Sequence, residues 1–157
     1  MKKALITLLC LLMITGCSSN SELSDEDKEY NEIVAKIENQ EDYIETQDYF
    51  NLDVSWQQVD SGMAYIVTLD ETKIDMYDLM IVTYGGEEED DILPNVGIYD
   101  DESYHLIVDY VDKSEGYYKG LQLSGLVDEE SDVLIYIHYY SDLSYNNENE
   151  LYIKVSL

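Results

Sequence analysis

At residue 50 the sequence changes to a pattern in which apolar and polar side chains alternate at successive positions. The first run has Phe50, Leu52, Val54 and Trp56 as its apolar members, and a similar run follows the turn residues at 60–62. Successive side chains of a β-strand point to opposite faces, so this period of two indicates strands with one buried face. An amphipathic helix would instead repeat its apolar residues every three or four positions. Most of the chain is therefore expected to form β-sheet.

Short segments of the same kind recur along the rest of the chain, separated by turn residues. We expect strands at 50–57, 63–69, 76–84, 95–99, 104–111, 119–127, 133–140 and 150–157. Strands this short, with no helical segment between them, favour antiparallel pairing in a β-sandwich or a partly open barrel. We predict a mainly β fold, an antiparallel β-sandwich built from residues 46–157.

Successive antiparallel connections alternate between the two ends of a sandwich, which divides the acidic loops into two sets. One end is expected to gather Asp60, 87–91, Asp112, Glu115, Asp142 and Glu148. The opposite end is expected to gather Glu71, Asp75, 100–102 and 128–132. Each end would then present carboxylates from several loops.

One amphipathic helix is expected before the strands, within residues 24–45. Ser24 is a good N-cap because acidic residues follow it and an acid stands three positions on. Tyr30, Ile33, Val34 and Ile37 then form an apolar stripe at helical spacing. Two interpretations of the stripe are open: it docks on the following domain, or it faces a partner or a second copy of the chain.

The N-terminal 16 residues have the pattern of a signal peptide, with two lysines followed by a short apolar run at 4–14. The residues Ile14, Thr15, Gly16 and Cys17 come next, and they resemble the lipobox of bacterial lipoproteins. The resemblance implies cleavage before Cys17 by the lipoprotein signal peptidase and a diacylglyceryl group on its thiol. Residues 17–23 would form a short lipidated tether. The expected location is the extracytoplasmic face of the cell membrane, with the protein anchored there by lipid.

The order of lipobox, short tether and strand-rich domain also resembles the immunoglobulin-like lipoproteins of Gram-positive bacteria. This resemblance concerns the architecture and implies an immunoglobulin-like β-sandwich. The chain lacks the Cys, Trp, Cys spacing of true immunoglobulin domains, and its one tryptophan, Trp56, falls on the first expected strand.

The charge of the chain is strongly one-sided. It holds 35 Asp and Glu residues against eight lysines and no arginine, which gives a formal net charge of -27. This balance excludes a nucleic-acid binder that neutralises phosphates, and it favours cationic partners such as basic peptides or basic proteins. No nucleic-acid partner is therefore expected.

The densest acidic run is Glu87, Glu88, Glu89, Asp90 and Asp91. It is a candidate Ca²⁺ site, since this ion takes six to eight oxygen ligands. The run matches no EF-hand loop or repeated calcium motif, so nothing in it fixes a ligand geometry. The alternative interpretation is a solvated acidic loop that keeps the domain soluble. No cofactor is expected otherwise.

The sequence offers no catalytic signature. His105 and Asp109 would share one strand face and His138 lies on another strand, but no nucleophile motif accompanies any serine and two isolated histidines do not make a zinc site. Tyrosine pairs at 117–118 and 139–140 place neighbours on opposite faces, so we expect some exposed tyrosines that could form a recognition surface.

These features together lead to the expectation of a non-catalytic binding module for a cationic protein or peptide, held at the membrane by Cys17. Two alternatives remain open at this point. One is an immunity or exclusion lipoprotein that intercepts a basic toxin or a phage component. The other is a Ca²⁺-dependent surface enzyme that works through the acidic loops.

Overall fold

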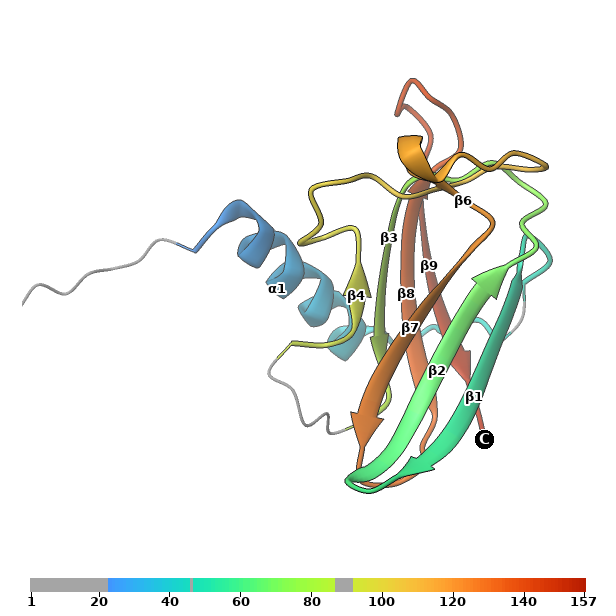
Figure 1. Ribbon diagram of the computed structural model, residues 1–157. Coiled ribbons are helices and arrows are strands. Elements are labelled where there is room, and N and C mark those ends of the chain that lie inside the picture. The colour runs from blue at the N-terminus through green and yellow to red at the C-terminus, as the bar shows by residue number, and fades with distance from the viewer. Residues whose placement is uncertain (1–22, 46, 87–91) are drawn as a thin grey trace, which may run out of the picture.

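The computed structural model describes residues 23–45, 47–86 and 92–157, and it has a mainly β architecture with one N-terminal helix (Figure 1). A three-stranded antiparallel sheet has the order β1-β2-β7 and a four-stranded antiparallel sheet the order β4-β3-β8-β9. The first consists of β1 (Asn51–Val59), β2 (Gly62–Asp70) and β7 (Gly120–Val127). The second consists of β4 (Asn95–Val96), β3 (Tyr77–Tyr84), β8 (Val133–Tyr140) and β9 (Glu148–Val155). The predicted mainly β fold with antiparallel sheets is confirmed.

The main core lies between these two sheets. Tyr65, Val67 and Leu69 of β2 are fully buried, and they pack in one cluster with Ile135 and Ile137 of β8. These residues occupy alternate positions of their strands, which is the period of two that the sequence shows. The sheets therefore pack face to face, as in a sandwich (Figure 1).

The helix α1 (Asp25–Asn39) covers the outer face of the four-stranded sheet (Figure 1). Ser24 forms the predicted capping box with Asp27, whose backbone N–H donates to the Ser24 Oγ at 3.0 Å. The buried stripe of Tyr30, Ile33 and Ile37 packs in a second cluster that includes Tyr136 of β8. Of the two interpretations of the apolar stripe, the structure therefore supports docking on the following domain.

The helix is shorter than the segment 24–45. It ends at Asn39, because Gln40 takes an extended conformation with φ -76° and ψ 130°. The chain then runs alongside the edge strand β9, where the backbone N–H of Ile44 donates to the carbonyl oxygen of Tyr152 at 2.9 Å.

The expected strand at 104–111 is wrong beyond its first residues. Only His105–Leu106 forms a strand (β5), and it pairs in parallel with Tyr117–Tyr118 (β6). Asp109 has a φ of 57°, in the left-handed region that Asp tolerates better than most residues, and the chain turns there. The prediction that His105 and Asp109 share a strand face is therefore also wrong.

The same turn corrects the predicted distribution of the acidic loops. Because 104–111 does not cross the sandwich, β7 runs in the opposite direction to the one expected, and its last residue Val127 pairs with Met63. The loop 128–132 thus lies at the same end as Asp60, close to Gly85, whose carbonyl oxygen accepts a hydrogen bond from the Ser131 hydroxyl.

The direction of β8 and the position of β5 determine at which end of the sandwich the remaining acidic loops lie. Tyr140 ends β8 opposite Tyr77 at the start of β3, and Met76 bridges to Leu106. The end that holds Glu71 and Asp75 therefore also holds Asp112, Glu115, Asp142 and Glu148. The acidic run 87–91 lies outside the described residues.

Candidate functional site

A small polar pocket lies where α1 crosses β8 and β9, and it has a volume of about 140 Å³. Most of its walls are charged, aromatic or otherwise polar, in contrast to the two cores. The pocket is lined by Glu29, Glu32, Ile33, Lys36, Met80, Tyr136, His138, Tyr140, Glu148 and Glu150. Both α1 and the sheet contribute side chains to this polar pocket.

The local structure explains why these side chains meet. Glu29, Glu32 and Lys36 stand three and four positions apart on α1, so they share one side of the helix. On β8, residues 136, 138 and 140 alternate and point to the sheet face that carries α1. On β9, residues 148 and 150 do the same, and the register places His138 opposite Glu150.

The Glu150 carboxylate is the centre of a hydrogen-bond network. The Lys36 ammonium donates to its Oε1, and the Tyr136 hydroxyl donates to the same oxygen at 2.9 Å. The Tyr152 hydroxyl donates to Oε2 at 3.4 Å. The Lys36 Nζ also lies 5.8 Å from the centre of the Tyr136 ring, within cation–π range.

These contacts perturb the ionisation of all three partners. The hydrogen bond to Glu150 raises the pKa of Lys36 above its ordinary value. Burial of the Glu150 carboxylate acts to raise its pKa, but the hydrogen bonds from Lys36 and Tyr136 outweigh burial and lower the pKa of Glu150. Burial and the neighbouring carboxylate raise the pKa of Tyr136. Lys36 and Glu150 are therefore held as a charged pair.

His138 lines the pocket and is only 4% exposed. Its Nε2 lies 2.9 Å from the Glu148 Oε1. The other ring nitrogen, Nδ1, has no hydrogen-bond partner in the described part of the chain, and it is the only such buried side-chain atom there. The Tyr140 ring meets the imidazole edge to face, at 5.1 Å between centroids.

The pocket carries an excess of negative charge. It contains four carboxylates and one ammonium group, and that ammonium is paired with Glu150. Across residues 23–45, 47–86 and 92–157, no ion pair to a lysine involves Glu29, Glu32 or Glu148. In the same residues, no group of three or more His, Cys, Asp or Glu side chains is placed to hold a metal ion. The carboxylates of Glu29, Glu32 and Glu148 give the pocket the chemistry to receive a cationic group.

A second, larger concavity of about 430 Å³ lies on the other flank of α1. Val34, Ile37, Leu93 and Leu134 give it mainly apolar walls, to which Tyr84 also contributes. It carries less charge than the polar pocket: Glu38 is its one carboxylate, and the Tyr30 and Tyr43 hydroxyls are already hydrogen-bonded to the backbone. We therefore place the candidate site in the polar pocket.

The other residues that the sequence singles out lie elsewhere. Ile14, Thr15, Gly16, Cys17 and Glu87–Asp91 fall outside the described residues. His105 belongs to a separate aromatic cluster, in which its Nδ1 accepts a hydrogen bond from the backbone N–H of Asp78 at 3.0 Å. Burial lowers the pKa of His105.

The tyrosine pairs do not form the expected exposed surface. Tyr139 is buried, Tyr140 is half-buried, and Tyr117 and Tyr118 are half-buried against His105 and Tyr104. Tyr139 faces the main core and Tyr140 lines the pocket beside α1, whereas Tyr117 and Tyr118 pack on neighbouring aromatic rings.

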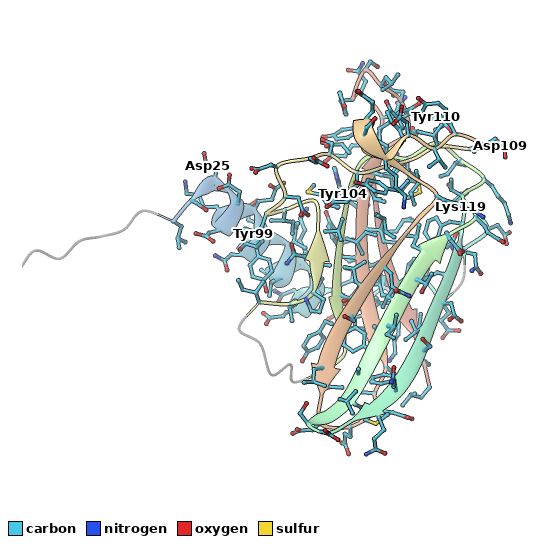
Figure 2. The ribbon with its side chains drawn as sticks, viewed as in Figure 1. Asp25, Tyr99, Tyr104, Asp109, Tyr110 and Lys119 are labelled. Carbon is cyan, nitrogen blue, oxygen red and sulfur yellow. The ribbon has the colours of Figure 1, made fainter. Side chains whose placement is uncertain are left out.

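The exposed tyrosines among the described residues are Tyr49, Tyr99, Tyr110 and Tyr145. Tyr99 stands beside α1, where its hydroxyl donates to Asp27, whereas Tyr110 stands at one end of the sandwich (Figure 2).

Sequence reasoning missed the pocket itself. The helical spacing of Glu29, Glu32 and Lys36 and the alternation of Glu148 with Glu150 are both visible in the sequence. They show which side chains share a face of their own element. They do not show that α1 packs across β8 and β9, because that depends on contacts more than 100 positions apart, such as the 114 positions between Lys36 and Glu150.

No protein-family model matches this sequence, and comparison with curated proteins and with solved structures gave no match. Among the described helices, none combines the length and the apolar character needed to cross a membrane.

Proposed function

We propose that this chain is a membrane-anchored extracytoplasmic lipoprotein whose β-domain is a non-catalytic binding module for a cationic protein or peptide. The observation that carries the proposal is the pocket between α1, β8 and β9, where three carboxylates pair with none of the lysines in the described part of the chain and lie beside a buried histidine. A cationic group entering this pocket would meet carboxylates from two directions, from the helix and from the sheet.

The charge of the whole chain supports the same class of partner. A net charge of -27 creates a field that attracts cations over about one Debye length, roughly 8 Å at physiological salt. Such a field raises association rates with basic partners, and the pocket supplies short-range contacts. Long-range attraction and short-range recognition would therefore act on the same ligand.

The anchoring part of the proposal rests on the sequence Ile14, Thr15, Gly16, Cys17. An anchor at Cys17 would hold the described domain next to the bilayer, because the tether of 17–23 spans only about 25 Å when fully extended. The test is to express the chain and a Cys17→Ser variant in a bacterium fed with labelled palmitate. We expect label and membrane association in the parent chain, and neither in the variant. Equal labelling of both chains would contradict the proposal.

The binding part is tested with a basic peptide of about ten alternating lysine and arginine residues, added to the full chain in nonionic detergent. We expect saturable binding whose Kd weakens by about tenfold or more as NaCl rises from about 50 mM to about 500 mM. A peptide of the same length with glutamine at every basic position is the control and should not bind. Absence of binding at low salt, or a Kd that salt does not change, would refute a cationic partner.

A further inference from the structure

His138 lines the pocket, and its ring carries a buried nitrogen with no hydrogen-bond partner among the described residues. The Glu148 carboxylate can only accept a hydrogen bond, so the neighbouring Nε2 carries the hydrogen. In the neutral ring this leaves Nδ1 as an acceptor with a lone pair and no donor in the described chain. A buried acceptor without a donor costs free energy, and a ligand N–H would relieve that cost.

The groups around His138 are also acceptors. Glu29, Glu32 and Glu148 bring carboxylate oxygens to the pocket wall. The donors of Lys36 and Tyr136 are directed at Glu150 and so are already used. The ligand that complements this set is one that donates several hydrogen bonds, accepts none and carries positive charge.

The size and shape of the pocket narrow the class of ligand further. A volume of about 140 Å³ admits the end of one side chain, but not a folded segment. The Tyr140 ring stands beside the imidazole and offers an aromatic surface. A guanidinium group has five N–H donors in a plane and stacks on aromatic rings, whereas an ammonium group has three donors and holds its water more strongly.

We propose that this pocket binds the guanidinium group of an arginine side chain, with the Nδ1 of His138 accepting one N–H and the carboxylates of Glu32 and Glu148 accepting others. The inference rests on the proposed function, since it names the residue by which a cationic partner is anchored. It adds a preference for arginine over lysine, which the overall negative charge does not provide.

The direct test uses the nitrogen resonances of the two histidine rings, since His105 and His138 are the only histidines in the chain. The full chain, labelled with ¹⁵N in its histidine rings and kept in nonionic detergent, is titrated with a blocked Gly-Arg-Gly peptide. We expect a saturable upfield shift of the His138 Nδ1 resonance. The His105 Nδ1 resonance serves as the internal control and should stay fixed, because that atom already accepts from Asp78.

The same titration with lysine or citrulline in place of arginine tests the preference. We expect the arginine peptide to bind about tenfold more tightly than the lysine peptide, and the neutral citrulline peptide not to bind. A His138 Nδ1 resonance that does not move with arginine would overturn the inference. Equal affinities for arginine and lysine would overturn it as well.

Two single substitutions test whether the arginine binds in this pocket. Glu32 is exposed on α1, so Glu32→Gln removes one charge without disturbing the core, and it should weaken arginine binding about fivefold or more. Glu41→Gln makes the same change outside the pocket and should leave the affinity unchanged. Equal effects of the two variants would show that only general charge matters, and would refute the site.

The two proposals fail in different ways. If the longer basic peptide binds with strong salt dependence but the His138 resonance is unaffected by the arginine peptide, the arginine site is wrong and the cationic partner stands. If the longer peptide does not bind at any salt concentration, the proposed function itself is wrong.

Discussion

Lys36 of α1 and Glu150 of β9 form an ion pair across 114 positions of the chain. Among the ion pairs that lysines form in the described residues, this is the one that joins the helix to the sheet. The Tyr136 hydroxyl donates to the same oxygen of the Glu150 carboxylate. The apolar stripe of α1 drives docking, whereas this pair fixes which residues of the helix face β9.

Replacing Lys36 with methionine should lower the free energy of unfolding by about 1 kcal/mol. The change removes the pair and leaves Glu150 charged and partly buried with fewer partners, but both side chains retain solvent contact, which limits the loss. Lys28→Met is the matched control, because its pair with Asp25 is within α1 and largely exposed, so its effect should be about 0.3 kcal/mol or less. Urea denaturation measures both. A Lys36→Met effect no larger than that of the control would show that the pair does not stabilise docking.

The contribution of Glu150 should depend on pH in a defined direction. Burial opposes ionisation, but the hydrogen bonds from Lys36 and Tyr136 hold the pKa of Glu150 below its value in the unfolded chain, which is about 4.3. A lowered pKa stabilises the fold above the unfolded value, and this stabilisation is lost as the pH falls through the folded pKa. We expect Glu150→Gln to cost about 1 kcal/mol at about pH 7, and progressively less as the pH falls below the unfolded value of about 4.3. A difference that is constant over this range would contradict the assignment.

Two glycines shape the space around Tyr65, a fully buried ring whose hydroxyl forms a hydrogen bond with Thr83 Oγ1 at 3.1 Å. A Cβ atom at Gly125 would lie 2.4 Å from the ring, and one at Gly85 would lie 2.5 Å from it. Gly125→Ala should therefore destabilise the fold by ~2 kcal/mol through overpacking. Tyr65→Phe keeps the ring and should cost about 1 kcal/mol.

Combining Gly125→Ala with Tyr65→Leu tests that mechanism. The smaller side chain should absorb the new methyl group, so the double variant should be more stable than the sum of the single effects implies. Thermal and urea denaturation of Gly125→Ala, of Tyr65→Leu and of the double variant provide the comparison, and the same measurements on Tyr65→Phe give the cost of losing the hydroxyl. Simple additivity would show that the ring is not what restricts position 125.

The acidic loops should respond to ionic strength without selecting one cation. At a net charge of -27 the folded state repels itself, so salt should raise the Tm by screening. We expect NaCl, MgCl₂ and CaCl₂ at equal ionic strength to raise the Tm alike, and a chelator to have no effect. A rise specific to Ca²⁺ would instead indicate a calcium site, for which the run at 87–91 would be the first candidate.

The strand pattern was predictable because it is local. The alternation in β1 and β2 follows directly from which side chains face the core, and the structure has strands there at Asn51–Val59 and Gly62–Asp70. The helix start was predictable for the same reason, since the Ser24 cap depends only on the next residues.

The prediction failed where a short apolar run does not become a strand. The residues around Asp109 read as an alternating segment, but the chain turns there and the Asp75 carboxylate accepts a hydrogen bond from the Val108 N–H at 3.1 Å. Because this segment does not cross the sandwich, β7 runs in the direction opposite to the expected one, and the loop 128–132 lies at the other end of the sandwich. The candidate site could not be predicted either, because it depends on how α1 lies on the sheet.

The measurement that tests the central claim most directly compares two triple variants of equal net charge. One carries Glu29→Gln, Glu32→Gln and Glu148→Gln in the pocket, and the other carries Asp53→Asn, Asp128→Asn and Glu129→Gln on exposed positions elsewhere. The ligand is the basic peptide of about ten lysine and arginine residues, at about 150 mM NaCl. We predict that the pocket variant loses about tenfold or more in affinity while the surface variant stays within about twofold of the parent chain. Equal losses in the two variants would contradict the claim that this pocket is where a cationic partner binds.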